Sequence, residues 1–569
     1  MKYYSVLILL LLVVLHITGC SSEENPKKLR SADNVKINSI TSKDREKLKK
    51  QVHRETLTEC KFKSVPEGRI MKRKLVCSQK VIVGNSKGMR ADNFNTETYD
   101  NIEENNLKFV KDEPLSTFSI DVDTASYSNI RRMLNRGELP PKGAVRIEEM
   151  VNYFNYNYPK VINENQPFAT NVTIGSCPWN DKSKLVRIAI KGKEIPAESR
   201  PKANLVFLLD VSGSMRSPNK LPLLRNALKM LVNNLNDQDR VAIVVYAGAS
   251  GLVLESTACN EKTKIMDALN RLSAGGSTNG AAGITQAYKV AVANFIEGGI
   301  NRVILCTDGD FNVGTTNQSD LINLIQKSAK SDVFLTVLGF GMGNYKDSTL
   351  EKLADKGNGN YGYIDDEKEA RKLLVKQIGG TLNTIAKDVK IQVEFNPSQV
   401  QAYRLIGYEN RKLNNEDFAN DEKDAGEIGA GHTITAFYEV FDNKTKLNAP
   451  ETPQTKYSKN VASDIAQNEI LEVKIRYKEP NGTKSKLLKF PLTGKIYDAI
   501  TSIDNDFKFA NAVIIFGMLL RHSKNIGSVN YNTVLKLAQN SVDDCKNKNY
   551  ERSEFINLVK KAQRLTALK

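Results

Sequence analysis

Apolar runs alternate with amphipathic segments between residues 200 and 380. Several of the runs are apolar at successive positions rather than at every second position. Strands that are covered by helices on both faces show this pattern, because neither face meets water. The runs are NLVFLLD (204–210), RVAIVVYAG (240–248), NRVILCTDG (301–309), VFLTVLGFG (333–341) and NYGYIDD (360–366), and the amphipathic segments are 221–235, 262–272, 281–297, 318–330 and 366–378. The alternation predicts an α/β fold with a doubly wound, mostly parallel sheet at 200–380.

The segments on either side of this domain have different patterns. Residues 106–199 contain an alternating strand, two short helical segments around Pro140-Pro141 and two further strands, which predicts a small N-terminal α+β region. Residues 381–498 contain runs that alternate apolar and polar positions, so we expect a β-rich domain with an antiparallel sheet. Residues 499–569 have apolar positions at helical spacing and predict a C-terminal helical segment. A chain of 569 residues is long enough for several such domains.

Basic residues are concentrated near the N-terminus. The whole chain has 82 Lys and Arg residues against 65 Asp and Glu residues, and residues 21–90 alone hold 19 basic against 8 acidic residues. This stretch has little apolar periodicity, so residues 20–105 are predicted to be a solvated basic tether. We expect no nucleic-acid partner. Attraction to an anionic membrane surface or glycan is the alternative role for this charge.

The first twenty residues have the pattern of a secretory signal. Lys2 precedes an apolar run at 6–15, which is too short to span a bilayer. The ending Ile-Thr-Gly-Cys resembles a bacterial lipobox, which implies that residues 1–19 are a signal peptide and that Cys20 carries the lipid. An ordinary signal peptide with an incidental cysteine is the alternative. Two or three acyl chains give stable anchoring. We therefore expect a lipid-anchored protein of the bacterial cell envelope, in the outer membrane, with the periplasmic or surface face left open.

Six further cysteines show no metal-binding spacing. No CxxC motif occurs and the chain has four histidines, so a zinc cluster is not expected. Cys60 and Cys77 are the one pair that suits a disulfide in an oxidising envelope, and whether they pair stays open. Cys306 lies within an apolar run and is expected to be a small buried hydrophobic residue. No thiol chemistry is indicated.

Oxygen-bearing side chains gather in three loops of the α/β domain. The candidate metal ligands are Asp210, Ser212, Ser214, Thr278 and Asp308, with Ser277 as an alternative to Thr278. The first three follow one apolar run at alternating positions, and Asp308 follows another. Ligands of open α/β sheets bind beyond the carboxyl ends of the strands, so we expect these side chains to meet. Carboxylate and hydroxyl oxygens suit a hard cation such as Mg²⁺. The pattern predicts a divalent-metal site at this edge.

Residues 204–378 resemble a von Willebrand factor type A domain, and the candidate ligands match its metal-ion-dependent adhesion site residue by residue. The resemblance implies that the two serines coordinate the metal directly, that the threonine does so when a ligand is bound, and that the two aspartates act through water. It also implies that the open coordination position takes a carboxylate from a protein partner. The flanking segments, such as STFSIDVDTASYSN and YRLIGYENRK, resemble bacterial envelope lipoproteins of the type A family over about residues 85–569.

We expect a membrane-anchored binding module that uses Mg²⁺, Mn²⁺ or Ca²⁺ to capture a protein ligand with an acidic side chain, for adhesion or complex assembly. The alternatives are an envelope scaffold with an unused metal site and a metal-assisted hydrolase. Enzyme activity is not expected, because residues 200–380 contain no histidine and the chain has neither a Gly-x-Ser-x-Gly elbow nor a Walker A loop. A hydroxyl-rich shell neutralises the charge of a metal poorly, which suits an incoming carboxylate better than water activation.

Overall fold

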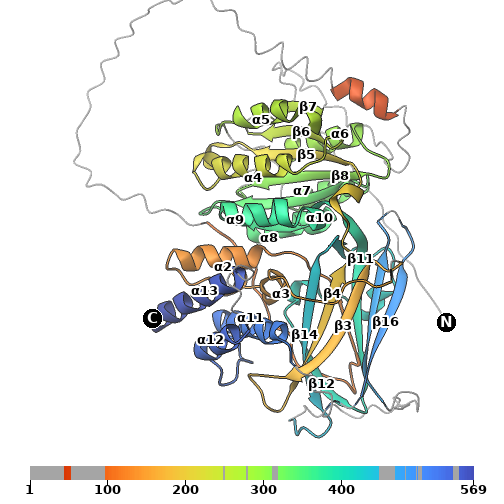
Figure 1. Cartoon of the computed structure of the whole chain (residues 1–569), viewed down its shortest axis with the longest axis vertical. Helices are drawn as coiled ribbons and strands as arrows, with labels where there is room; N and C mark the ends of the chain where they lie inside the picture. The colour runs from red at the N-terminus through yellow and green to blue at the C-terminus, as the bar shows by residue number, and fades with distance from the viewer. Residues whose placement is uncertain are drawn as a thin grey trace, which may run out of the picture. The chain divides into compact units, whose positions relative to one another are not determined.

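The computed structural model describes residues 44–52, 96–163, 165–247, 250–276, 280–309, 318–447, 468–480, 482–494, 496, 503–541 and 550–568. Its central α/β domain contains a sheet with the strand order β10-β9-β8-β5-β6-β7 (Figure 1). The strands are β5 (Ala203–Asp210), β6 (Arg240–Tyr246), β7 (Ser250–Ala258), β8 (Ile300–Thr307), β9 (Phe334–Phe340) and β10 (Tyr361–Ile364). All neighbouring strands pair in parallel except β7, which runs antiparallel to β6 at the edge. The predicted mostly parallel sheet is confirmed, and β7 is an addition that the sequence analysis did not predict.

Helices cover both faces of this sheet. On β5, Leu205, Phe207 and Leu209 enter one apolar cluster together with α4, α5 and α9. The intervening Val206 and Leu208 enter a second cluster, together with α6, α7 and α8. The helices are α4 (Leu221–Asn233), α5 (Lys262–Asn270), α6 (Gly280–Ala293), α7 (Gln318–Ala329), α8 (Asp347–Lys356) and α9 (Glu367–Arg371), and α10 (Ile378–Leu382) leads out of the domain. Burial of both faces explains why this strand is apolar at successive positions.

Two antiparallel sheets pack around one apolar cluster and take strands from both sides of the α/β domain. One sheet has the order β1-β12-β14-β4-β3, and the other has the order β13-β11-β15-β16 with β2 also paired to β11. The strands are β1 (Lys108–Phe109), β2 (Leu115–Ser119), β3 (Phe168–Ser176), β4 (Lys184–Gly192), β11 (Thr384–Phe395), β12 (Val400–Ile406), β13 (Gly426–Gly429), β14 (Thr433–Asp442), β15 (Glu469–Lys478) and β16 (Lys486–Thr493). Along the β4–β14 pair, Lys184 lies opposite Val440 and Lys191 opposite Thr433. The sequence pattern predicts separate regions at 106–199 and 381–498, whereas the structure joins them through these strand pairs.

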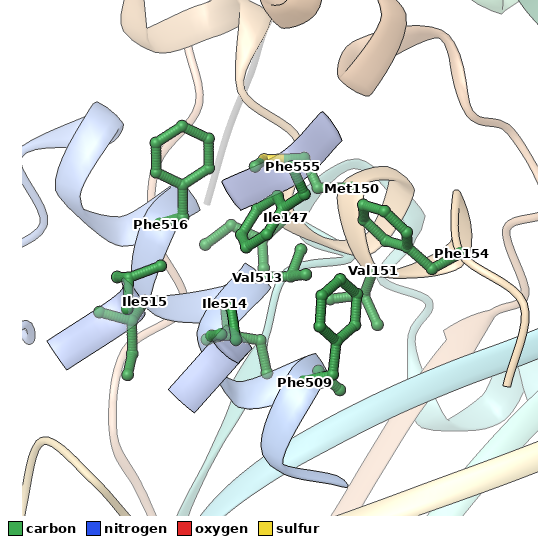
Figure 2. Close-up of a cluster of buried hydrophobic side chains, with 14 of the residues drawn as sticks. Ile147, Met150, Val151, Phe154, Phe509, Val513, Ile514, Ile515, Phe516 and Phe555 are labelled. Atoms are coloured by element: carbon green, nitrogen blue, oxygen red, sulfur yellow. The ribbon is translucent and has the colours of Figure 1, made fainter. Parts of the chain in front are cut away.

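A helical layer also combines helices from before and after the α/β domain in the sequence. It contains α2 (Ala125–Asn135), α3 (Ile147–Asn152), α11 (Asn505–Arg521), α12 (Tyr531–Gln539) and α13 (Tyr550–Ala567). Figure 2 shows side chains of α3 and α11 that pack together, with Phe555 of α13 nearby. The ring of Phe555 lies 5.4 Å from Phe509 and 5.7 Å from Phe154, centre to centre. A Cβ at Gly517 would come within 2.8 Å of Ile147, so glycine permits the close approach of α11 to α3. The predicted C-terminal helices are confirmed. Of these, α11 packs against α3 and α13 packs against α2.

Two parts of the predicted tether are folded. Residues 44–52 form a helix in which Val52 is buried and Arg45 lies over the ring of Phe295. Thr96 donates its main-chain N–H to the Gly343 carbonyl at 2.7 Å, beside the α/β domain. The predicted signal peptide, the lipid-bearing Cys20 and the Cys60–Cys77 pair lie outside the described residues. Across the part of the chain that the structure describes, no helix has both the length and the apolar character needed to cross a membrane.

Candidate metal centre

Asp210 stands at the carboxyl end of the central strand β5 and is fully buried. Its Oδ1 accepts the main-chain N–H of Ser212 at 2.9 Å, and its Oδ2 accepts the hydroxyl of Thr307 at 3.1 Å. Thr307 is the last residue of the neighbouring strand β8. The two hydrogen bonds fix the carboxylate at the sheet edge where a ligand of an open α/β sheet binds.

The two serine hydroxyls lie next to each other beyond this carboxylate. Ser212 Oγ and Ser214 Oγ are 3.0 Å apart, at the start of a short helical turn at Gly213–Arg216. Ser212 is buried, whereas Ser214 is exposed. One hydroxyl therefore lies on the protein side of the site and the other faces solvent. Any group held between them would be reachable by a partner.

Asp308 lies at the end of β8 and has a basic neighbour that the sequence analysis missed. The side chain of Lys220, just before α4, donates from Nζ to Asp308 Oδ2 at 2.8 Å. Both side chains are buried, and Asn344 contacts both of them at 3.1 and 3.3 Å. Gly341, with φ of 78°, leaves room for the Lys220 side chain, since a Cβ there would come within 2.3 Å of it. A lysine before a helix is typically a surface residue, so nothing in its position signalled this contact.

Gly275 and Gly276, which precede the candidate ligand Thr278 in sequence, lie beside the serine loop. Gly275 donates its N–H to the Val211 carbonyl at 2.8 Å, and Gly213 donates to the Gly276 carbonyl at 3.2 Å. Thr278 and its alternative Ser277 lie outside the described residues. The structure therefore brings together Asp210, Ser212, Ser214 and Asp308, and it places the beginning of the Thr278 loop next to them.

These donor groups fit a divalent cation of magnesium size. Two neighbouring oxygens of an octahedral Mg²⁺ site with bonds of about 2.1 Å lie about 3.0 Å apart. The two serine hydroxyls form a hydrogen bond at 3.0 Å in the metal-free chain, and their oxygens therefore already have this spacing. Burial, together with the charge of Asp308, raises the pKa of Asp210 to about 6, although the hydrogen bonds from Ser212 and Thr307 oppose the rise. A cation at this edge would offset the buried negative charge that causes the shift.

Thiol groups are not available for chemistry in the described part of the chain. Cys177, Cys259 and Cys306 are free and buried, as expected for Cys306. Burial raises the pKa of the Cys177 thiol to about 12 and that of Cys259 to about 11, and it raises the pKa of Cys306 further. These thiols stay protonated at neutral pH, and the thiolate is the reactive form.

Comparison with protein families shows three adjacent matches. The model of the von Willebrand factor type A domain matches residues 204–377. A model described as von Willebrand factor matches residues 93–187, and one described as uncharacterized protein YfbK, C-terminal, matches residues 380–565. The matches follow the order of the α/β domain and its two flanks.

Comparison with whole proteins gives a similarity that extends over most of the chain. The chain is 41% identical to uncharacterized protein YfbK of Escherichia coli (strain K12) over 489 residues, which is 84% of either protein. It is 31% identical to inter alpha-trypsin inhibitor, heavy chain 4, of Mus musculus over 184 residues, which is 30% of this chain and 19% of that protein. Among solved structures, von Willebrand factor type A from Catenulispora acidiphila aligns with 68% of this chain and 88% of its own, with a TM-score of 0.39 and 17% identity.

Proposed function

This chain belongs to the family of bacterial von Willebrand factor type A domain-containing proteins that includes YfbK of Escherichia coli, and from this premise we propose that it is a metal-dependent binding module of the cell envelope. Type A domains generally mediate protein interactions, and they often bind a divalent metal. The proposed partner is a protein that presents an acidic side chain. The proposed metal ligands are Asp210, Ser212, Ser214, Thr278 and Asp308.

One observation carries the proposal: the two serine hydroxyls lie 3.0 Å apart beside a fully buried aspartate at the end of the central strand. Asp210 and Asp308 supply negative charge from two neighbouring strands, and Ser214 faces solvent. A Mg²⁺ ion bound there would supply an open coordination position for a carboxylate oxygen of the partner. This open coordination position would lie beside the exposed Ser214, where a folded partner can reach it.

The proposal does not include enzyme activity. Residues 200–380 contain no histidine that could serve as a general base near the site. The described thiols are buried and protonated. These features favour capture of a carboxylate over hydrolysis.

A scaffold with an unused metal site is the second candidate, and the Lys220 contact favours it. The ammonium group already lies 2.8 Å from Asp308 and offsets one of the two negative charges. With Asp308 paired, Asp210 is the only uncompensated carboxylate among the described candidate ligands, so the site gains less from a cation than two free carboxylates would. The two candidates therefore differ in whether the native chain binds Mg²⁺ at all.

The metal site is tested by titrating Mg²⁺ and Mn²⁺ into the chelator-treated full chain by calorimetry, beside the variant Asp210→Ala/Ser212→Ala. We expect the native chain to bind one cation and the variant to bind at least tenfold more weakly, a loss of about 1.4 kcal/mol or more. The reason is that the variant loses one buried carboxylate and one of the paired hydroxyls. Asp237→Ala, which removes a carboxylate from an exposed loop, should bind like the native chain.

The same three proteins, immobilised and exposed to envelope extract, test capture. We expect envelope proteins to be retained by the native chain with Mg²⁺, and released by chelator, but not to be retained by the double variant. Equal metal binding by the native chain and the double variant would contradict the assigned site. Identical retention with and without chelator would contradict metal-dependent capture.

The anchor is proposed from the sequence of residues 17–20 and has its own test. We expect the native chain to sediment with the outer membrane of the producing bacterium, whereas Cys20→Ser moves most of it to the soluble fraction, because acyl chains provide the attachment. Labelling with a radioactive fatty acid should mark the native chain alone. A Cys20→Ser chain that stays in the membrane fraction would show that another segment provides the attachment.

A further inference from the structure

Three carboxylates converge at a second place, remote from the loops of the first site. Asp388, Asp424 and Glu427 each offer one oxygen to a group in which these atoms lie within 4.8 Å of one another. Asp388 occupies an irregularity of β11, where the register with β13 shifts between Ala386 and Val389. Asp424 and Glu427 lie on either side of the point at which β13 begins. The strand pairing between β11 and β13 therefore brings the three side chains together.

Glu427 is the buried member of this group, with 6% of its surface exposed. Among the described residues, its Oε1 has no hydrogen-bond partner although the atom is excluded from solvent. Burial raises the pKa of Glu427 well above its ordinary value, and the charges of Asp424 and Asp388 add to the rise. The fully buried Arg302 opposes it, but its guanidinium donates to the hydroxyls of Thr336 and Thr384. A buried carboxylate in this state needs either a proton or a cation.

Two lysines compensate only the outer carboxylates. Lys478 Nζ lies 2.7 Å from Asp388 Oδ2, and Lys356 Nζ lies 3.6 Å from Asp424 Oδ2. The other oxygen of Asp388 accepts the N–H of Ala425 at 3.3 Å. Among the described residues no ion pair reaches Glu427, and Arg302 acts on it only through its charge. Because each carboxylate oxygen has two lone pairs, these contacts leave acceptor capacity on all three side chains.

We propose that Asp388, Asp424 and Glu427 form a Ca²⁺ site at the junction of β11, β13 and the end of α8. Two oxygens bound to one Ca²⁺ ion at about 2.4 Å can lie no more than about 4.8 Å apart, and the group meets this limit. Carboxylate oxygens are the preferred ligands of Ca²⁺, and water can fill the remaining positions of its six to eight. Lys356 is the last residue of α8 in the type A domain, so the site lies where that domain meets the antiparallel sheets.

The experiment separates this site from the first by using Asp210→Ala/Ser212→Ala as the parent chain. Ca²⁺ is titrated by calorimetry into the chelator-treated full chain of the parent, and its melting temperature is measured with and without Ca²⁺. We expect binding of one Ca²⁺ ion and a rise in melting temperature. Adding Glu427→Gln should weaken binding at least tenfold without lowering the melting temperature in chelator, because the amide is neutral and has the size of the protonated carboxyl group that the raised pKa of Glu427 favours in the metal-free chain. Glu422→Gln, on the exposed segment before β13, is the matched control and should bind like the parent.

Asp424→Asn provides an independent variant, since its side chain is only partly buried and the substitution leaves the core unchanged. It should also weaken Ca²⁺ binding at least tenfold, and it decides the question if Glu427→Gln does not fold. The proposal is wrong if the parent binds no Ca²⁺ up to about 10 mM, which exceeds the Kd of weak protein calcium sites. It is equally wrong if both carboxylate variants bind Ca²⁺ like the parent. Failure here leaves the Mg²⁺ site untouched, because the parent already lacks that site.

Discussion

Lys220→Met is expected to destabilise the metal-free chain by about 3–5 kcal/mol and to strengthen its binding of Mg²⁺ by about tenfold or more. The ammonium group of Lys220 and the carboxylate of Asp308 are 2.8 Å apart, and their side chains are 8% and 0% exposed. Removing one partner of a buried ion pair leaves the other charge without compensation, which is the source of the stability loss. The same change removes a positive charge that repels an incoming cation. At about 5 Å and an effective dielectric constant of 20, the repulsion between this charge and the two charges of Mg²⁺ is about 7 kcal/mol.

The two effects are measured on one protein under two conditions. Denaturant unfolding in chelator should show the full destabilisation, and unfolding in excess Mg²⁺ should show much less, because bound metal replaces the lost positive charge. Calorimetry then measures the change in affinity. Lys229→Met removes the same charge from α4 itself and should leave both quantities within the range of an ordinary surface substitution.

This variant also distinguishes the two candidate functions. If the native chain is a binding module, Lys220 lowers its affinity for Mg²⁺ and keeps the empty site folded. If the chain is a scaffold, the ammonium group is the permanent counter-ion, so the native chain binds no Mg²⁺ and only Lys220→Met binds it. Unchanged affinity in the variant would therefore contradict competition between lysine and metal.

The type A domain was predictable because its apolar strand runs and its amphipathic helical segments all indicate the same fold. Each central strand is apolar at successive positions, as in Leu205 to Leu209, and this pattern arises only when both faces are covered. Asp210 is the last residue of such a strand and Asp308 directly follows another, so the two carboxylates were expected at the same edge of the sheet. The hydroxyl pair of Ser212 and Ser214 followed from the same loop. These inferences need only contacts that are close in sequence or set by parallel strand order.

The pairing of the flanking segments could not be predicted in the same way. Both faces of β4 and β14 are buried, one in the apolar cluster of the helical layer and the other in the cluster between the two antiparallel sheets, and this burial does not say which strand lies beside each. Their partners are separated in sequence by the whole type A domain. For the same reason the sequence analysis missed Lys220, whose partner Asp308 is 88 residues away. It also missed Glu427, whose neighbour Asp388 belongs to another strand.

Buried charge also links the type A domain to the helical layer, at Arg146. Its guanidinium donates hydrogen bonds to Glu149 in α3 and to Asp347 at the start of α8, and it lies 3.8 Å from Glu351. The side chain is 6% exposed, and those of Glu149 and Asp347 are 0% and 1% exposed. Burial raises the pKa of Glu149 to about 8 although Arg146 opposes the rise. The arginine is therefore the positive charge around which acidic groups of both parts gather.

Arg146→Ala is expected to destabilise the full chain by about 3–5 kcal/mol, because it leaves several buried carboxylates without their common partner. The loss should be larger at pH 8 than at pH 6. A carboxyl group whose pKa is raised in the folded state stabilises that state while it is protonated, and this contribution falls as pH rises toward the folded-state pKa. Without Arg146, the pKa of Glu149 rises further and the pH dependence becomes steeper. Denaturant unfolding at both pH values measures the effect.

Arg136→Ala, whose side chain is 44% exposed beside Glu138, is the control and should change stability by less than about 0.5 kcal/mol. A loss below about 1 kcal/mol for Arg146→Ala at pH 8 would mean that the acidic groups are compensated by other charges, such as Arg411, which lies 3.6 Å from Glu351.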